Sequence, residues 1–438
     1  MVFDTTILGS NPSAPAKKMN ILSLNNNFLS KIKKKLFPFY KSKEIDKIFK
    51  ILEKDQPKNK RVAMFVGGCV RKYLENQNID DIDIATIFSP EELKVKFKDT
   101  AVRVIETGID HGSIILMINN IKFEITTLRK DIKTDGRHAK VSYTDNWQED
   151  SNRRDFTINS IYMDRKGKIF DPQMGVKDLN NKIIKFIGNP TQRIEEDFLR
   201  IIRFIRFSLQ YNSQPSKLNL EAIKLNINGI KKLSKERILN ELYKILHLNN
   251  LINLKKNVEL KEIFLLIFPE LKYLNRIERQ EFLIDLKLSN DFTLALLLID
   301  ESDNYEYFCH KYKTSNILKE KLKLLSSLFR QYKLDKNFFT KNLKKNIYLF
   351  GKENIQDLNI LIFFTSQKNI YKKYLDVSNK IKNVPIQRFP FDGKYLMQKG
   401  LIEGKKIGSA LSVLEKKWID NDLYLSDIEA ENIISKIK

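Results

Sequence analysis

Hydrophobic and polar residues alternate over short distances in the first part of the chain. Apolar residues at helical spacing predict an amphipathic helix over residues 41–52. Asn119 and Asn120 separate two alternating runs, as in a tight hairpin. Short apolar runs predict strands at residues 62–66, 102–104, 113–118 and 122–127. We therefore expect an α+β domain with a mixed β-sheet and helices.

After about residue 183 the pattern becomes almost wholly helical. Leu, Ile, Phe and Lys recur with a period near 3.6 to the end of the chain. This shift predicts a domain boundary followed by an all-α remainder. We expect a head at residues 41–182, a neck at 183–250, a body at 251–340 and a tail at 341–438.

Residues 1–18 do not follow either pattern. They are loop-like and lack the basic-then-apolar order of a secretion signal. Gly9-Ser10-Asn11-Pro12 is also what the T-loop sequence of a tRNA gene encodes in one frame. We expect a non-native or disordered extension, read through from an upstream tRNA gene, with translation beginning at Met19.

Two acidic residues mark one predicted strand. Asp81 and Asp83 would project from the same face, while Ile82 and Ile84 turn into the core. Two carboxylates in one small patch repel each other unless a divalent cation lies between them. Mg²⁺ suits this arrangement, because it takes few carboxylates and fills its other positions with water and phosphate oxygens. The alternative is a solvated strand end.

The glycines just upstream fit the same chemistry. Gly67 and Gly68 end the apolar strand and open a predicted helix that carries Arg71. Backbone amides in such a turn can face a triphosphate.

A second polar run contains two adjacent arginines. Arg153 and Arg154 offer rigid forks for triphosphate oxygens, Asp155 could orient them, and Asn159 could reach a phosphate or ribose. A buried structural Arg–Asp pair is the alternative.

A third run, residues 195–207, is predicted to be one helix. Asp197 and Arg200 are three residues apart, on one face. Cytosine and adenine both present an amine beside an unprotonated ring nitrogen, so an acceptor-only Asp and a donor-only Arg would select them over uracil and guanine. Arg203 and Arg206 would extend the basic face toward phosphates or the primer. An ordinary salt-bridged helix is the alternative.

The composition favours a polyanionic partner. The formal net charge is +24 over 438 residues, which an extended RNA contact would explain; a lysine-biased proteome is the alternative. Two cysteines, Cys69 and Cys309, fit a reducing compartment. No stretch has the apolar length of a membrane span, so we expect a cytoplasmic protein without a membrane partner.

In combination, these motifs resemble those of the class II CCA-adding enzymes (tRNA nucleotidyltransferases) and the related bacterial poly(A) polymerases, within the polymerase-β-like nucleotidyltransferases. The resemblance runs from about residue 62 to residue 242. Its motifs are Gly67-Gly68-x-x-Arg71 with Asp81-x-Asp83, residues 153–160, residues 171–179, Glu196-Asp197-x-x-Arg200, and residues 233–242. It implies template-independent addition of CCA to tRNA 3′ ends from CTP and ATP, with no protein partner inferred.

The resemblance also implies roles for single residues. Asp81 and Asp83 would bind two Mg²⁺ ions, and Asp197 and Arg200 would act as the protein's template. Glu124 would be a third carboxylate on an adjacent strand; a salt bridge to Arg129 or a lysine is equally open.

Two further segments take roles from the family. Asp135-Gly136-Arg137 would belong to a mobile loop that helps switch the site from CTP to ATP, and Lys405 and Lys406 would hold tRNA. The open alternatives are a poly(A) polymerase, a CC- or A-adding enzyme, and a non-catalytic RNA-binding protein.

Overall fold

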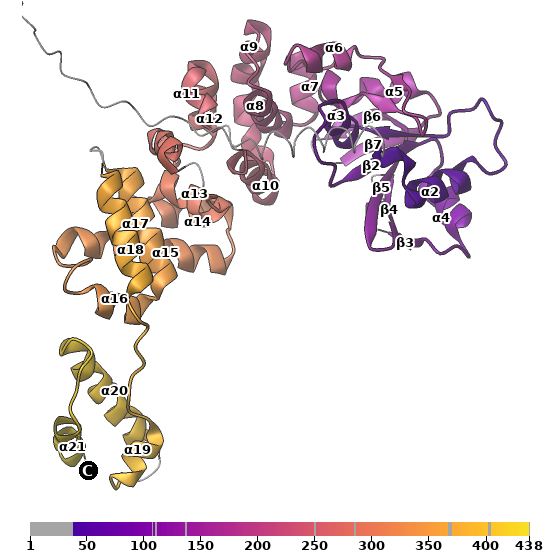
Figure 1. The fold of residues 1–438 in the computed structure, drawn as a ribbon. Helices are drawn as coiled ribbons and strands as arrows, with labels where there is room; N and C mark the ends of the chain where they lie inside the picture. The colour runs from indigo at the N-terminus through magenta and orange to yellow at the C-terminus, as the bar shows by residue number, and fades with distance from the viewer. Residues whose placement is uncertain are drawn as a thin grey trace, which may run out of the picture. The chain divides into compact units, whose positions relative to one another are not determined.

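The computed structural model describes residues 38–437, apart from residues 107, 110, 111, 136, 137, 249, 250, 284, 285, 367–369, 402 and 403. The chain forms two compact units, residues 1–189 and residues 190–438 (Figure 1). The predicted extension at residues 1–18 lies outside the described residues.

A mixed sheet forms the centre of the first unit. Its described strands are β1 (Ala63–Val66), β2 (Ile82–Thr86), β3 (Arg103–Ile105), β4 (Ser113–Ile118), β5 (Ile121–Thr127), β8 (Tyr162–Met163) and β9 (Ile169–Phe170). They lie in the order β3-β4-β5-β2-β1-β8-β9. The β2–β5 pair is parallel and the other pairs are antiparallel. Asn119 and Asn120 both have positive φ, 47° and 64°, and they close the β4–β5 hairpin as predicted.

Short helices surround this sheet. They are η1 (Phe39–Lys41), α2 (Lys43–Glu53), α3 (Gly68–Leu74), α4 (Pro90–Phe97), α5 (Trp147–Asn152), η3 (Thr157–Asn159) and α6 (Gly175–Asn180). The predicted helix at residues 41–52 is confirmed as α2, which buries Ile45, Ile48, Phe49 and Leu52. Trp147 of α5 packs with Tyr162 of β8 in a buried apolar cluster. The helix α5 and the strand β8 are therefore fixed to one core.

The segment after β5 contradicts the prediction of an irregular loop. β6 (Arg129–Asp135) pairs with β7 (His138–Tyr143) in a two-stranded antiparallel ribbon (Figure 1). Backbone hydrogen bonds form this ribbon. Its first strand is polar apart from Ile132, but Ala139, Val141 and Tyr143 alternate in its second strand, a signal that was missed. Asp135 pairs with His138, while Gly136 and Arg137 lie outside the described residues.

The second unit is helical throughout its described part. It begins with α7 (Pro190–Glu196), α8 (Leu199–Tyr211), α9 (Lys217–Asn226), η4 (Ile227–Lys232) and α10 (Lys235–Leu246). It continues with α11 (Asn253–Lys256), α12 (Val258–Ile267), η5 (Leu274–Leu283), α13 (Asn290–Leu298), α14 (Asn304–Tyr312) and α15 (Asn316–Leu334). It ends with α16 (Leu343–Phe350), α17 (Lys352–Thr365), α18 (Tyr371–Asn383), α19 (Gly393–Gln398), α20 (Lys405–Asp420) and α21 (Asp427–Ser435). The predicted fold class, an α+β head followed by helices, is confirmed.

The predicted single helix at residues 195–207 is interrupted. α7 ends at Glu196 and α8 starts at Leu199. The Asp197 carboxylate accepts a hydrogen bond from the Leu199 amide at 3.1 Å, so it competes with the continuous helical ladder. Phe198 then packs so closely on Gly229 that a Cβ at position 229 would lie 2.1 Å from its ring.

No helix in the described part of the chain combines the length and the apolar character that a membrane crossing requires.

Candidate active site

The predicted acidic residues of the head lie on neighbouring strands. Asp83 on β2 is directly opposite Glu124 on β5 in the parallel register, and Asp81 immediately precedes β2. Residues opposite each other in register project from the same face of a sheet. The structure therefore brings Glu124 to the Asp-x-Asp pair, and Glu124 forms no ion pair within the described residues. We call Asp81, Asp83 and Glu124 the carboxylate cluster.

Negative charge is unbalanced in this cluster. The pKa of Asp83 is raised to about 6: burial raises it most, the Glu124 and Asp81 charges raise it as well, and Arg154 and Arg71 oppose them. Glu124 acts on Asp83 more strongly than either arginine, and Asp81 more strongly than Arg71, so the arginines do not fully compensate the carboxylates. Such a patch favours a bound cation.

The glycine turn borders the same space. Gly67 has φ of 71°, and a Cβ there would lie 3.9 Å from both the Asp83 Oδ2 and the Asn159 carbonyl. Four residues later on α3, Arg71 donates through Nη1 to Asn159 Oδ1. Asn159 Nδ2 in turn donates to Asp155 Oδ1 at 2.7 Å. Gly67, Gly68, Arg71, Asp155 and Asn159 thus form a connected border to the cluster.

Cys69 supports the strand from behind. Its buried thiol donates to the carbonyls of Val66 at 3.3 Å and Asp83 at 3.6 Å. Burial raises the pKa of this thiol to about 11, so it stays neutral and has a structural role.

The two predicted phosphate-binding arginines share one buried partner. Asp150 on α5 pairs with Arg153 at 2.7 Å and with Arg154 at 3.0 Å. Asp155, which was predicted to orient the arginines, accepts from the Phe156 amide at 2.8 Å and from Asn159 Nδ2 at 2.7 Å. Asp150 was missed although a signal existed, because it precedes the arginines by three and four residues. The buried Arg–Asp pair that was the alternative is therefore present. The charge of Arg154 still acts on Asp83 and lowers its pKa.

The predicted base-reading pair, Asp197 and Arg200, lies at the α7–α8 break in the second unit. Asp197 Oδ2 accepts from Arg237 Nη2 of α10 at 2.8 Å. Arg200 is 9% exposed and donates through Nη1 to Glu196 Oε2 at 2.6 Å and to the Arg193 carbonyl at 2.8 Å. Asp197 and Arg200 are thus each engaged by neighbouring groups, and these contacts hold each side chain in a fixed direction.

Arg203 and Arg206, expected to face phosphates or the primer, converge on an acid from another helix. Glu241 of α10 accepts from Arg206 Nε at 2.8 Å and lies 3.7 Å from Arg203 Nη1. Burial would raise the pKa of Glu241, but Arg206, Arg203 and Lys244 outweigh it, so the pKa is lowered. Glu241 braces α8 against α10.

The chain matches the family model of the poly A polymerase head domain over residues 63–185. It is 32% identical over 409 residues to the CCA tRNA nucleotidyltransferase 1, mitochondrial, of Homo sapiens, covering 85% of each protein. The chain belongs to the CCA-adding tRNA nucleotidyltransferase family. It is also 30% identical over 400 residues to the CCA-adding enzyme of Streptococcus uberis, covering 84% of this chain and 91% of that protein.

Solved structures of CCA-adding enzymes share the fold. The Bacillus stearothermophilus enzyme in complex with CTP matches with a TM-score of 0.65 and 22% identity, covering 85% of this chain and 92% of that one. The Thermotoga maritima enzyme complexed with tRNA matches with a TM-score of 0.61 and 20% identity, covering 92% and 98%. The likeness therefore extends well beyond the head.

Members of the nucleotidyltransferase family generally use divalent metal ions. The described residues include no group of three or more His, Cys, Asp or Glu side chains arranged to hold a metal. The Asp81–Asp83 pair nevertheless fits Mg²⁺, which binds through one or two carboxylates and completes its shell with water and substrate phosphates. The excess negative charge around Asp83 supports the same fit.

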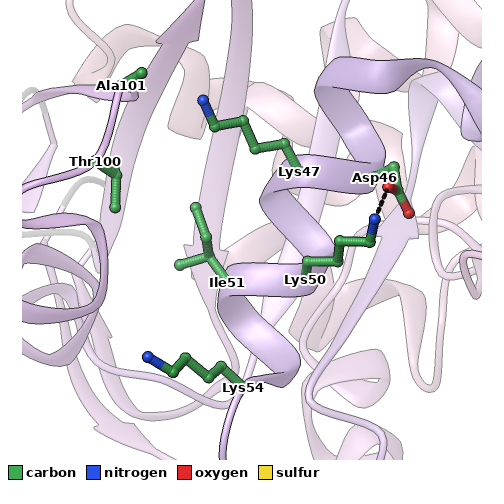
Figure 2. Close-up of a pocket in the computed structure, with 7 residues that line it drawn as sticks. All are labelled: Asp46, Lys47, Lys50, Ile51, Lys54, Thr100 and Ala101. Carbon is green, nitrogen blue, oxygen red and sulfur yellow. Dashed lines mark ion pairs between the residues drawn. The ribbon is translucent and has the colours of Figure 1, made fainter.

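A separate hollow of about 450 Å³ lies beside α2. Figure 2 shows Lys47, Lys50 and Lys54 along one side of it, with Thr100 and Ala101 opposite and Lys50 paired with Asp46. It contains none of the predicted site residues.

Proposed function

We propose that this protein adds CCA to the 3′ end of tRNA without a nucleic-acid template, using CTP and ATP and releasing pyrophosphate. The observation that supports it best is the Asp83–Glu124 register beside Asp81, because it creates an unbalanced acidic site next to arginines. Family membership supplies the substrate class. CTP and tRNA are named for related structures.

In this proposal Asp81 and Asp83 hold Mg²⁺, and Glu124 adds negative charge beside them. When bound, the metal acidifies the tRNA 3′-hydroxyl and neutralises the charge that develops on the phosphates. Arg71, Arg153 and Arg154 bind the triphosphate. Gly67 and Gly68 carry no side chain, which leaves the backbone of the neighbouring turn accessible. Asn159 orients Arg71 and is positioned to contact the sugar.

Asp197 and Arg200 select the base in the proposal. Asp197 accepts from the exocyclic amine of cytosine or adenine, and Arg200 donates to the ring nitrogen. UTP or GTP would set donor against donor and acceptor against acceptor, which costs about 1–3 kcal/mol for each unpaired group. That Asp197 and Arg200 act on the same nucleotide as the carboxylate cluster remains a prediction.

The remaining assignments are also proposals. Lys405 and Lys406 begin α20 directly after Gly404, where they would contact tRNA phosphates. Asp135, Gly136 and Arg137 would act in the change from CTP to ATP. Cys69 and Cys309 are buried, unpaired thiols, which suits a reducing compartment, and we propose the cytoplasm.

The deciding experiment is primer extension on a tRNA that lacks its terminal CCA. We expect two cytidines with CTP alone, one further adenosine when ATP is added, and no extension with UTP or GTP. Long adenosine tails would instead indicate a poly(A) polymerase, and a halt after CC with both nucleotides a CC-adding enzyme. tRNA binding without any incorporation would indicate an RNA-binding protein.

A further inference from the structure

We propose that Asp150 is a positioning residue for nucleotide binding, which sets the direction of both arginines of the triphosphate site. This inference rests on the proposed function. Asp150 is 0% exposed on α5. Its Oδ1 accepts from Arg153 Nε at 2.8 Å and Nη2 at 2.7 Å, and its Oδ2 accepts from Arg154 Nε at 3.1 Å and Nη2 at 3.0 Å.

The geometry of these bonds gives the arginines a direction. Both guanidinium groups present the same edge, Nε with Nη2, to the carboxylate. Because the guanidinium fork is planar and rigid, this turns the Nη1 side of Arg153 and of Arg154 away from Asp150. Because Asp150 holds both guanidinium groups by the same Nε–Nη2 edge, the Nη1 sides of Arg153 and Arg154 are both directed away from it.

Tyr162 fixes the carboxylate itself. Its hydroxyl donates to Asp150 Oδ2 at 2.7 Å and accepts from Arg154 Nε at 3.1 Å. Tyr162 is 0% exposed and belongs to β8, next to β1 in the sheet. The arginine pair is therefore attached to the sheet core rather than to the end of a short helix.

The arrangement indicates a role in binding. Asp150 holds two neighbouring guanidinium groups, and guanidinium groups are strong donors to the oxygens of an anionic ligand. Arg154 also acts electrostatically on Asp83. By holding Arg154, Asp150 keeps it as a phosphate ligand and keeps Asp83 available for a metal ion.

The test compares three variants of the full chain. Asp150→Asn keeps the shape of the carboxylate and removes its charge, and Tyr162→Phe removes only the hydroxyl. Glu53→Gln is the matched control, since Glu53 pairs with Arg165 at 2.6 Å elsewhere in the same unit. The measurements are KM and kcat for CTP and ATP, CTP affinity by calorimetry, the Mg²⁺ concentration for half-maximal rate, and the thermal midpoint.

We expect Asp150→Asn to raise KM for both nucleotides about tenfold and to raise the Mg²⁺ requirement, with kcat changed by less than about threefold. Tyr162→Phe should raise KM about threefold, and Glu53→Gln should leave KM unchanged. A role in stability alone would lower the thermal midpoint without changing KM, and that result would overturn the proposal.

Two outcomes are separated by design. If Asp150→Asn does not fold, Tyr162→Phe decides, and an unchanged KM for that variant would contradict the inference. If the wild-type protein incorporates no nucleotide, the proposed function fails. Calorimetry still tests Asp150 in that case, because CTP affinity needs neither RNA nor turnover: weaker binding by Asp150→Asn supports the inference, and wild-type affinity overturns it.

Discussion

Two buried acids in this protein, Asp83 and Glu241, differ in how their charge is balanced. In the head, Asp83 is buried beside Glu124 and its pKa is raised to about 6. In the helical unit Glu241 is 2% exposed, yet Arg206, Arg203 and Lys244 more than offset its burial and lower its pKa. Burial raises the pKa of both acids and is the largest single cause in each, and the balance of neighbouring charges decides whether that rise is reversed. An unbalanced acid provides a place for a cation, whereas a balanced acid is part of the scaffold.

The proposed base-reading pair belongs to the balanced type. Asp197 is paired with Arg237, and Arg200 with Glu196. Side chains that are already held lose little conformational freedom on binding. In the proposed function the carboxylate cluster takes an added ion, whereas Asp197 and Arg200 already have partners of opposite charge.

The largest expected effect is on nucleotide incorporation at the carboxylate cluster. Asp83→Asn and Asp81→Ala should each reduce nucleotide incorporation by about 10³-fold or more, because the metal loses a ligand. Labelled CTP incorporation into a tRNA lacking its CCA end measures this. Asp80→Asn is the matched control: Asp80 is adjacent but pairs with Lys72 at 2.8 Å, and it should retain activity. Near wild-type incorporation by Asp83→Asn would refute the assignment.

The next largest effect should follow the loss of the Glu241 carboxylate, which braces α8 against α10. Glu241→Gln should lower the free energy of unfolding by about 3 kcal/mol at neutral pH, since it leaves buried arginines without their acid. The folded-state pKa of Glu241 lies below its ordinary 4.5, so its stabilisation is present above that value and is lost as pH falls further. Urea unfolding of both proteins at pH 7 and at pH 3.5 should show the difference shrinking in acid.

A smaller effect concerns nucleotide choice. Asp197→Ala should raise the efficiency of UTP and GTP relative to CTP by about 10- to 100-fold, because the unfavourable contact of about 1–3 kcal/mol is removed. Nucleotidyl transfer from CTP should fall less than in Asp83→Asn. The control is Glu195→Ala, because Glu195 lies two residues before Asp197 and is exposed. Discrimination equal to that of the wild type would show that Asp197 does not read the base.

The smallest effect should appear in the metal-free protein. The folded-state pKa of Asp83, about 6, exceeds its ordinary 3.8. The folded state therefore binds more protons than the unfolded state between these values, and stability from this group falls as pH rises from about 4 to 6. In EDTA we expect Asp83→Asn to be more stable than wild type by up to about 2 kcal/mol at pH 7 and equal to it near pH 3.5. Thermal melts across this range, repeated with Mg²⁺, measure it; a less stable variant at pH 7 would indicate a balanced Asp83.

Local patterns predicted much of the fold. Helical spacing located α2, and the Asn119-Asn120 turn located the β4–β5 hairpin, because both depend on residues a few positions apart. The β6–β7 ribbon was missed, since its first strand is almost wholly polar and the short alternation of Ala139, Val141 and Tyr143 was overlooked. The break between α7 and α8 was missed as well, because a side-chain cap at Asp197 and the packing of Phe198 on Gly229 override helical periodicity.

The sequence by itself determined which residue types are available for chemistry: the Asp81–Asp83 pair on one strand face, the adjacent arginines, and the Asp197–Arg200 spacing. Only the tertiary structure decided how their charges are balanced. It placed Glu124 beside Asp83 through a parallel strand pair, and it brought Arg237 to Asp197 and Glu241 to Arg206 from another helix. The physical reason is that burial of apolar faces brings distant segments together, and the charges that meet there cannot be read from local spacing.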